Sequence, residues 1–376
     1  MTTTVDCNVR LFTSGRSWIE GMAVNQLYAA ARLDGVQFAA GFPDLHPGKG
    51  SPVGAAFVVA ERIYPHLIGN DVGCGMALFR TDIVSRKARI ERWVNYAFDL
   101  EHPWEGDTRG FLASHAVPST EFDDALGTIG GGNHFAELQA VDEVFNAREF
   151  ACTGLDQGTL VLLVHSGSRG FGDQTLRAHV AEHGARGVDA TNAAARTYLR
   201  EHAVALKWAA ANRALIARRF AEALGSEAHC VWDGCHNSIT QVERASGPVW
   251  LHRKGATPSD TSFAVVPGSR GSLSYIVKLL ANSQDNAWSV AHGAGRKWSR
   301  SESRVRMRER FRVSELTHTP FGGRVVCEQR DLLYEEAPGA YKNVDVVVQD
   351  LVDAGLVSVI ATTRPLLTYK TRMVRR

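Results

Sequence analysis

A histidine in a loop of small residues is the strongest candidate for covalent chemistry in this chain. His292 is followed by Gly293, Ala294 and Gly295, and then by Arg296. Small neighbours leave room for a bulky adduct on the ring, and neutral imidazole is a competent nucleophile toward phosphorus. An arginine nearby could stabilise developing charge. The alternative interpretation is a histidine that lies in the core or binds a metal.

Side chains that can bind a metal recur in four other segments rich in glycine, asparagine or serine. The candidate ligands are Asp71 and Cys74 in GNDVGCG, His134 in GGGNHF, His165 in HSGSRG and His236 in DGCHNS. A carboxylate, a thiolate and imidazoles suit a divalent transition ion, and the thiolate could bridge two ions. Cys235 competes with His236 as the ligand of its segment. Ordinary turns and strand-end histidines are the alternative.

Glycine-rich segments elsewhere have the composition of phosphate-binding loops. The glycines of residues 127–132 would let backbone amides approach an anion. Residues 252–257 (HRKGAT) and 266–272 (VPGSRGS) add basic side chains and hydroxyls. Arg169 could form two parallel hydrogen bonds to a phosphate. Each segment could also be an ordinary turn, but together they predict one site assembled from distant parts of the chain.

Short β-rich segments must position these side chains, because several motifs directly follow an apolar run. The predicted strands are Val53–Ala60, Met76–Asp82, Thr159–His165, Glu227–Trp232, Val249–His252, Phe263–Val266, Arg324–Glu328 and Leu356–Thr363. The predicted helices are Gly21–Leu33 and Asp189–Leu224. The second is long enough for two helices, with Asp189 or Thr191 as N-cap and Gly225 as its stop.

The pattern predicts an α+β fold, a single mixed domain over residues 1–376. Regular βαβ alternation is missing, and so is any linker rich in Pro or Ser. A G-x-G-x-x-G segment after a strand and a G-x-x-x-x-G-K-[ST] segment are both absent from the sequence. Rossmann and P-loop nucleotide sites are therefore not expected.

Composition is that of a soluble globular enzyme. The chain has 376 residues, a net charge of +2, 44% hydrophobic and 22% charged residues. Its six cysteines form no C-x-x-C pair, which argues against a zinc ribbon or thioredoxin-type motif. The N-terminal residues do not read as a signal peptide, and no apolar run approaches the roughly 18 residues that span a bilayer. We expect a cytoplasmic protein with reduced thiols and no membrane partner.

Taken in order along the chain, these motifs resemble the RtcB family of RNA ligases. The matching strings are DLHPG, D-x-x-CG, GNHF-x-E, H-x-GSRG, HN, HRKGAT, PGS-x-G, HGAGR and YK-x-VD, and the resemblance runs from Asp44 to Lys370. One such string could arise by chance, whereas nine in family order are highly specific. The resemblance implies an RtcB-like fold and a ligase that joins RNA ends bearing a 3′-phosphate or 2′,3′-cyclic phosphate to 5′-hydroxyl ends, in RNA repair or tRNA splicing.

The resemblance also implies a role for each matched residue. GTP and two Mn²⁺ ions would be the cofactors, and His292 would be the catalytic nucleophile that carries GMP. The implied metal ligands are Asp71, Cys74, His134, His165 and His236, with Cys74 bridging. The implied GTP contacts are Asn133, Glu137, Asn237, Pro267, Gly268, Ser269, Ser274, His292, Gly293, Ala294, Gly295, Tyr341 and Lys370. RNA phosphates would be held by Arg169, Arg296 and Arg300.

Two positions depart from the family's pattern. Gly73 stands where many members have Asn before the cysteine, and Arg270 stands where Met is common. The chain also looks short for the family. These departures bear on the RNA-binding surface and the range of RNA substrates more than on the chemistry. Whether an archease-type activator is needed is open. The competing hypotheses are a dinuclear metal phosphoesterase that acts on RNA without guanylylation and a non-catalytic RNA-binding homologue.

Overall fold

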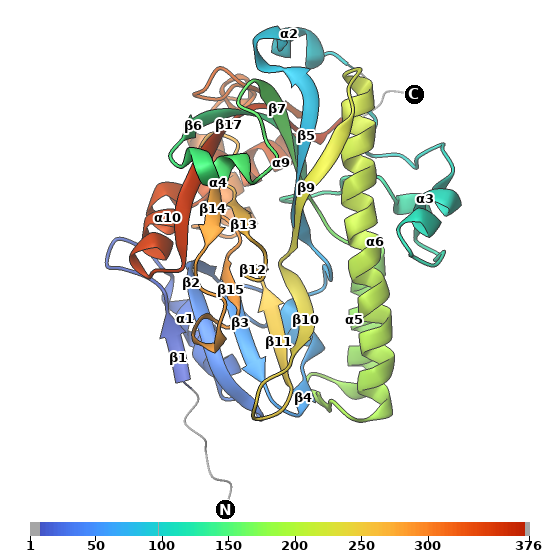
Figure 1. The fold of residues 1–376 in the computed structure, drawn as a ribbon, viewed down its shortest axis with the longest axis vertical. Helices are drawn as coiled ribbons and strands as arrows, with labels where there is room; N and C mark the ends of the chain where they lie inside the picture. The colour runs from blue at the N-terminus through green and yellow to red at the C-terminus, as the bar shows by residue number, and fades with distance from the viewer. Residues whose placement is uncertain (1–7, 97, 373–376) are drawn as a thin grey trace, which may run out of the picture.

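Two large β-sheets and one long helix form the framework of the protein (Figure 1). The computed structural model describes residues 8–96 and 98–372. The larger sheet has the strand order β13-β14-β17-β6-β7-β5-β9, with β16 paired to β17. Its strands are β5 (Gly75–Val84), β6 (Phe135–Val144), β7 (Thr159–Ser166), β9 (Ala228–Cys235), β13 (Phe263–Val266), β14 (Ser274–Leu279), β16 (Arg324–Cys327) and β17 (Val357–Thr371).

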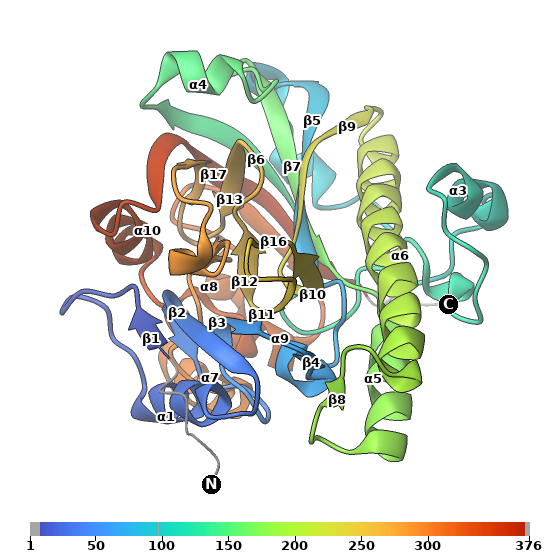
Figure 2. The ribbon, with the colours of Figure 1, turned by 60° about the horizontal axis from the view of Figure 1, so that its bottom comes forward.

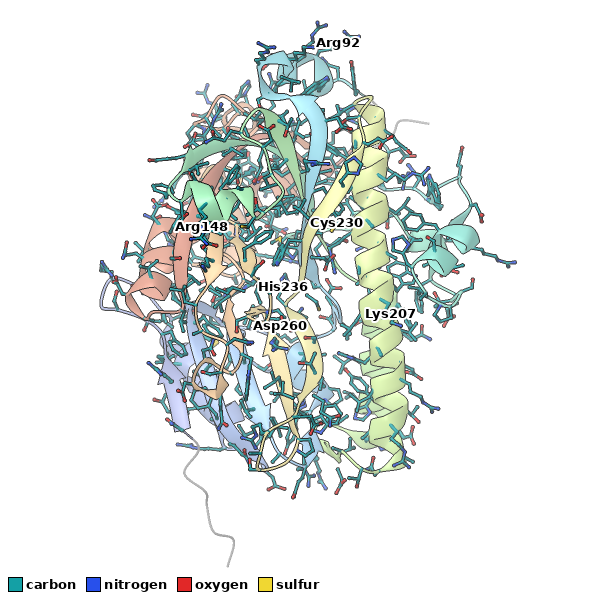
Figure 3. All side chains as sticks on the ribbon, in the orientation of Figure 1. Arg92, Arg148, Lys207, Cys230, His236 and Asp260 are labelled. Carbon is teal, nitrogen blue, oxygen red and sulfur yellow. The ribbon has the colours of Figure 1, made fainter. Side chains whose placement is uncertain are left out.

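The second sheet has the order β1-β2-β3-β11-β10. Its strands are β1 (Asn8–Leu11), β2 (Val36–His46), β3 (Val53–Val59), β10 (Asn237–Val242) and β11 (Val249–Lys254), and two short pairs accompany it: β4 (Arg62–Ile63) with β8 (Val188–Asp189), and β12 (Ala256–Pro258) with β15 (Ser289–Ala291). Since β9 ends at Cys235 and β10 begins at Asn237, the single residue His236 joins the two sheets. His236 lies near the middle of the molecule in Figure 3.

Helices cover the outer faces of the sheets. They are α1 (Gly21–Ala31), α2 (Ile90–Trp93), α3 (Thr108–Ser114), α4 (Ala147–Ala151), α5 (Gly170–His183), α6 (Ala193–Ala223), α7 (Arg300–Arg310), α8 (Val313–Leu316), α9 (Arg330–Glu335) and α10 (Val344–Asp353). Within the described residues, five short 3₁₀ turns add to them: η1 (Pro65–Ile68), η2 (Ser85–Lys87), η3 (Asp123–Ala125), η4 (Gln284–Asn286) and η5 (Pro338–Ala340). Helix α6 lies beside β9 in both Figure 1 and Figure 2 and packs against β5 and β7 as well.

The larger sheet is buried on both faces. On one face, Leu163 and Ile276 pack with residues of the second sheet and of α10. On the other, Leu162 packs with Phe220 of α6. Burying a side chain of this size contributes about 1.5–3 kcal/mol, so the strand ends that carry the motifs are held on a rigid support.

The predicted fold class and all eight predicted strands are confirmed, with strand ends shifted by at most a few residues except at β17, which continues to Thr371. The start of the long helix is corrected. Helix α6 is one helix of 31 residues, and Asn192 caps it by accepting a hydrogen bond from the amide of Ala195. Asp189 ends strand β8 and instead accepts from Thr191, so neither can cap the helix.

Residues 1–7, 97 and 373–376 lie outside the described part, so the predicted domain extent of 1–376 stays a prediction. Among the helices of the described ranges, we find none with both the length and the apolar character needed to cross a membrane.

Candidate active site

A cavity of about 470 Å³ opens where the two sheets meet. Every residue to which the family resemblance assigns a catalytic, metal-binding, GTP-binding or RNA-binding role lines it, with the exception of Ser274, whereas Cys235, the competing ligand of its segment, does not. The motifs that lie far apart in the chain are thus brought to one place.

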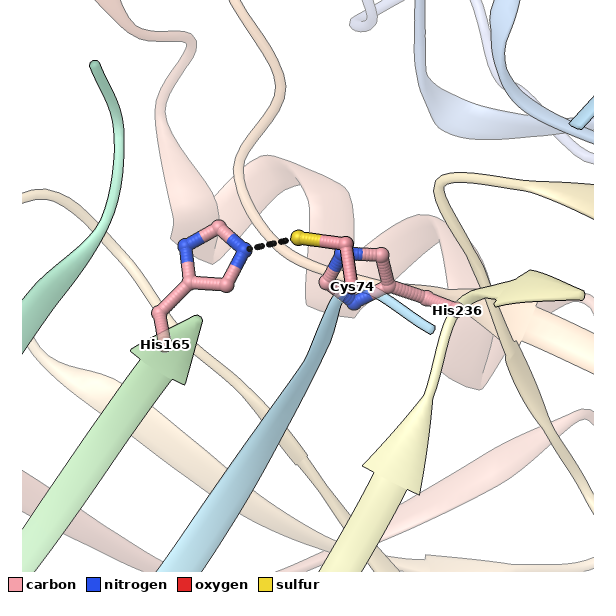
Figure 4. A group of neighbouring side chains, drawn as sticks. All are labelled: Cys74, His165 and His236. Atoms are coloured by element: carbon pink, nitrogen blue, oxygen red, sulfur yellow. Dashed lines mark hydrogen bonds between the residues drawn. The ribbon is translucent and has the colours of Figure 1, made fainter. Parts of the chain in front are cut away.

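Two overlapping groups of potential metal ligands lie in this cavity. Asp71, Cys74 and His134 form one group, and Cys74, His165 and His236 form the other, with the ligand atoms of each group within 4.8 Å of one another. The Cys74 Sγ lies 3.5 Å from the Nε2 of His134 and 3.2 Å from that of His165. Figure 4 shows this thiol between His165 and His236. One thiolate shared by two groups is the arrangement that a bridged pair of ions requires.

Sheet topology explains why these ligands meet. Strand β5 lies between β7 and β9 and runs antiparallel to both. Its first residue, Gly75, therefore pairs with Ser166 at the end of β7 and with Cys235 at the end of β9. Cys74, His165 and His236 are the neighbours of these three residues, so all arrive at the same edge of the sheet.

Hydrogen bonds fix the tautomer of two of the histidines. The Nδ1 of His134 lies 3.0 Å from the carbonyl oxygen of Ile129, and the Nδ1 of His165 lies 3.2 Å from that of Asn133. A carbonyl can only accept, so Nδ1 carries the proton in both rings. The Nε2 atoms then face Cys74, and that of His134 also lies 3.0 Å from the Oδ2 of Asp71. Metal-binding histidines are usually oriented in this way, with the other ring nitrogen bonded to the protein.

Protonation states also suit a cation. Burial, and then the neighbouring histidines, hold the pKa of His165 well below its ordinary value, and burial and His292 do the same for His236. Both rings are therefore neutral. Burial and the nearby carboxylate of Asp71 raise the pKa of the Cys74 thiol well above its ordinary value. A bound transition ion would reverse that preference, because it deprotonates a coordinating thiol.

Two buried atoms of these groups have no hydrogen-bond partner among the described residues. They are the Oδ1 of Asp71 and the Nδ1 of His236. Leaving a buried polar atom unsatisfied costs about 1–3 kcal/mol. The orphaned atoms and the mixed S, N and O donors both fit a pair of divalent transition ions such as Mn²⁺ or Zn²⁺.

His292 lies against the second ligand group and is oriented by a carboxylate. Its Nδ1 is 2.6 Å from the Oδ2 of Asp44, and its backbone amide donates to the same oxygen at 3.1 Å. Asp44 is fully buried. Because the carboxylate accepts at Nδ1, the lone pair of the ring is left on Nε2. The ring centroids of His292 and His236 are 4.7 Å apart.

A glycine lets the backbone approach this ring. A Cβ at Gly255 would lie 2.9 Å from the Cε1 of His292, and the φ of Gly255 is +63°. Both facts exclude an ordinary side chain there.

Polar side chains form one buried wall of the cavity. Glu137 accepts hydrogen bonds from the hydroxyl of Thr368 at 2.5 Å and from the amide of Gln139 at 2.6 Å. Burial raises the pKa of Glu137, although those two bonds oppose the shift. Ser274, a predicted GTP contact, lies behind this wall, where its hydroxyl accepts from Gln139 at 3.1 Å. Its influence on the cavity would therefore pass through Gln139 and Glu137.

A buried carboxylate that the sequence interpretation missed organises another wall. Glu336 lies 2.9 Å from the guanidinium of Arg296 and 3.9 Å from the ammonium of Lys370, and it accepts from the hydroxyl of Tyr341. Burial opposes ionisation, but the charges of Lys370 and Arg296 hold the pKa of Glu336 below its ordinary value. Burial lowers the pKa of Lys370 to about 8.

The three predicted RNA contacts differ in how free they are. Arg296 is committed to Glu336, to the carbonyls of Trp298 and Glu335 and to the ring of Tyr341, 5.2 Å from its guanidinium carbon. The other two are more available. Arg169 donates to the hydroxyl of Thr128 at 3.3 Å, and the half-exposed Arg300 donates to Asn133 at 3.2 Å.

The basic residues of the HRKGAT segment are directed at protein groups. Arg253 donates to Ser289, Thr240 and the carbonyl of Trp288. Lys254 donates to Ser51 and to the carbonyl of Lys49. In this structure the two side chains hold neighbouring segments together.

Contacts with neighbouring helices account for both departures from the family pattern, Gly73 and Arg270. Gly73 has a φ of +78°, and a Cβ there would lie 2.8 Å from the Cβ of Ala209 on α6. A glycine is therefore needed where the loop touches the helix. Arg270 is buried and donates to the carbonyls of Leu333 and Glu336, at the end of α9.

The sequence matches the family model described as tRNA-splicing ligase RtcB over residues 26–101 and 88–371. It is 44% identical over 353 residues to the RNA-splicing ligase RtcB2 of Escherichia coli, covering 94% of this chain and 93% of that protein. Identity is 30% over 443 residues to the tRNA-splicing ligase RtcB of Archaeoglobus fulgidus, covering 93% and 91%. It is 29% over 436 residues to that of Thermococcus kodakarensis, covering 91% and 90%. The similarity thus extends over nearly the whole chain.

Proposed function

The chain belongs to the RtcB family of RNA-splicing ligases, and we propose that it seals RNA ends by chemistry that depends on GTP and Mn²⁺. It joins a 3′-phosphate or 2′,3′-cyclic phosphate to a 5′-hydroxyl, in RNA repair or tRNA splicing. The intermediate is GMP bound covalently to His292. Support comes from the nine family motifs in order and from their convergence on one cavity.

In the first step, the Nε2 of His292 attacks the α-phosphorus of GTP. A P–N bond forms, and pyrophosphate leaves. Asp44 keeps the proton on Nδ1, so the lone pair is on the attacking nitrogen. The carboxylate, 2.6 Å away, also stabilises the positive charge that the ring gains.

The RNA then reacts in two further steps. An oxygen of the 3′-phosphate attacks the phosphorus on His292, the P–N bond breaks, and the RNA end becomes joined to GMP through a pyrophosphate. The 5′-hydroxyl of the second RNA end attacks the RNA-side phosphorus of this linkage and loses its proton. The P–O bond to GMP breaks, and GMP leaves. Water must first open a cyclic phosphate to the 3′-phosphate.

Asp71, Cys74, His134, His165 and His236 would hold two Mn²⁺ ions, which when bound polarise phosphoryl oxygens and neutralise negative charge. The residues themselves position the reacting groups. The same donors also suit Zn²⁺.

Nucleotide contacts are assigned to the two polar walls. Glu137 and Tyr341 face the guanine, and Lys370 contacts the nucleoside, while Asn133, Asn237 and Ser269 hold phosphate or ribose groups. Pro267, Gly268 and residues 293–295 line the space between them. Ser274 acts from behind through Gln139.

RNA phosphates are assigned to Arg169 and Arg300, with Arg296 supporting the guanine side of the cavity through Glu336 and Tyr341. Binding through arginines weakens as salt rises, because the RNA takes back its counterions. A cytoplasmic location and an archease-type activator complete the proposal.

The observation that carries the proposal is the place of His292. Its ring lies against His236 of the second ligand group, and a buried carboxylate is bonded to its Nδ1. A dinuclear phosphoesterase has no need of an oriented histidine outside its ligand set. A non-catalytic RNA-binding protein needs neither that histidine nor the metal ligands.

Incubation with α-labelled GTP and Mn²⁺ tests the proposal, comparing the unmodified protein with His292→Ala. We expect a covalent, acid-labile GMP adduct that the variant lacks, with equal metal content in the two proteins. If the unmodified protein binds metal but forms no adduct, the ligase proposal is contradicted. The phosphoesterase or the non-catalytic RNA-binding protein would then be favoured.

A further inference from the structure

Two consecutive residues of α6 reach the backbone of the metal-binding segments. Arg213 is fully buried. Its Nη1 donates to the carbonyl of Gly73 at 2.8 Å and to that of Ser166 at 3.0 Å. Its Nε and Nη2 donate to the two carboxylate oxygens of Asp233 at 2.8 and 2.6 Å. One guanidinium therefore holds three segments at once.

The preceding residue, Asn212, holds the Ser166 segment at two further points and adds a fourth segment, at Gly127 and Thr128. Its side-chain oxygen accepts from the amide of Gly127 at 2.7 Å. Its amide nitrogen is 3.2 Å from the hydroxyl of Ser166, 3.1 Å from the carbonyl of Gly167 and 3.4 Å from that of Thr128. Asn212 is also fully buried. Both its side-chain oxygen and its side-chain nitrogen are therefore bonded to these loops.

The contacted residues flank the candidate ligands. Gly73 precedes Cys74, Ser166 follows His165, and Asp233 lies three positions before His236. Gly127 and Thr128 open the glycine segment that leads to His134. Every segment that carries a ligand of the two groups is bonded to Asn212 or Arg213.

We propose that Asn212 and Arg213 are positioning residues that set the spacing of the dinuclear metal site. The inference rests on the proposed function, because it assumes that the two groups bind ions. Partners behind the ligands of a metal site orient them, and their loss typically lowers metal affinity about 10–100-fold.

The shape of the arginine side chain is essential to this role. A guanidinium presents its donors in a planar fork, so it can bridge a carboxylate on one side and two carbonyls on the other. Asp233 neutralises the buried charge, which would otherwise be costly. A lysine keeps the charge but offers a single nitrogen, so it can bond to only part of this set.

The chain offers a matched control in Arg253. It is also buried and donates to three protein groups, Thr240, Ser289 and the carbonyl of Trp288. Thr240 lies four positions after His236, within strand β10, and Trp288 and Ser289 belong to a segment that carries no candidate metal ligand. Replacing either arginine by lysine removes the same buried fork, but only one replacement touches the ligand-bearing loops.

The test is a titration of metal-free full-length protein with Co²⁺, followed by the near-ultraviolet charge-transfer band of a cobalt thiolate. Unmodified protein, Arg213→Lys, Asn212→Leu and Arg253→Lys are compared, and chemical denaturation of the metal-free proteins measures the stability of each. We expect Arg213→Lys and Asn212→Leu to bind Co²⁺ about 10–100-fold more weakly. Arg253→Lys should bind Co²⁺ with the affinity of the unmodified protein, even if it lowers the stability of the fold as much as Arg213→Lys does.

Equal affinity in all four proteins, or the same loss in Arg213→Lys and Arg253→Lys, would overturn the positioning role and leave the proposed function intact. Absence of the thiolate band in the unmodified protein would overturn both. If Arg213→Lys does not fold, Asn212→Leu decides by the same criterion.

Discussion

Asp44 and His292 lie 248 positions apart in the chain, and in the proposed reaction their hydrogen bond selects the ring nitrogen that attacks GTP. The sequence predicts the histidine, because a loop of small residues marks it. It also marks the DLHPG string, but it gives no means of pairing an aspartate with a histidine so distant. Glu336 was missed for the same reason, since its partners Arg296 and Lys370 belong to two other segments.

At this scale we predict the effect of Asp44→Asn. An asparagine amide can donate to Nδ1, which leaves the proton on Nε2 and removes the attacking lone pair. The single-turnover rate of GMP transfer to His292 should fall on the order of 10²- to 10⁴-fold. Co²⁺ affinity should be unchanged, since Asp44 belongs to neither ligand group. Asp71→Asn is the contrasting variant and should lose affinity. An Asp44→Asn protein with the normal rate would contradict the orienting role.

At the scale of elements, several strands that lead into a motif were predicted, such as β7 and β9, whereas β2, β6 and β15 were among those missed. Strand β2 contains Gly41 and Pro43, which ordinarily interrupt strands, and its register with β3 shifts between Gly41 and His46. Strand β6 carries buried Glu137 and Gln139 in place of an apolar alternation. Their polar partners come from β14 and β17, so nothing local to either segment reveals the strand.

Helix α9 depends on a side chain from another part of the fold. Its last turn leaves the carbonyls of Leu333 and Glu336 without partners inside the helix, and Arg270 donates to both. Arg270→Met, which restores the residue common in the family, should lower the free energy of unfolding by about 1–3 kcal/mol, because it orphans buried carbonyls.

Urea denaturation at neutral pH measures this loss. Arg304→Met is the control. Arg304 of α7 pairs with Asp331 of α9, and because both side chains are partly exposed, the replacement should cost less than about 1 kcal/mol. Equal losses in the two variants would contradict the capping role.

At the scale of the whole molecule, buried neutral histidines couple folding to pH. Burial lowers the pKa of His202 from 6.5 to about 4, and that of His252 to about 3. Each ring accepts a backbone amide, of Ile239 and Tyr64 respectively, through Nε2. As pH falls below 6.5 the unfolded chain takes up protons that the folded protein refuses, so stability is lost down to about pH 4.

We therefore predict a decline of about 1.4 kcal/mol per pH unit for each such histidine in that window. His202→Gln keeps a side-chain acceptor for the amide of Ile239. It should reduce the number of protons taken up on unfolding by about one, and so make the free energy of unfolding fall less steeply with falling pH. Urea denaturation between pH 7 and 4 tests this, with His229→Gln as the control, because that ring is exposed. An unchanged slope in His202→Gln would contradict the prediction.

Strand β17 spans Val357–Thr371 and lies inside the larger sheet, where it pairs with β14, β6 and β16. A ribosome that has translated only as far as residue 356 has therefore made all three partners of a strand that does not yet exist. Their unpaired edges stay open to other chains until β17 emerges. The nascent protein must be kept from aggregating until residues 357–371 have been made, and a premature stop upstream of residue 357 removes the middle of the sheet rather than its margin.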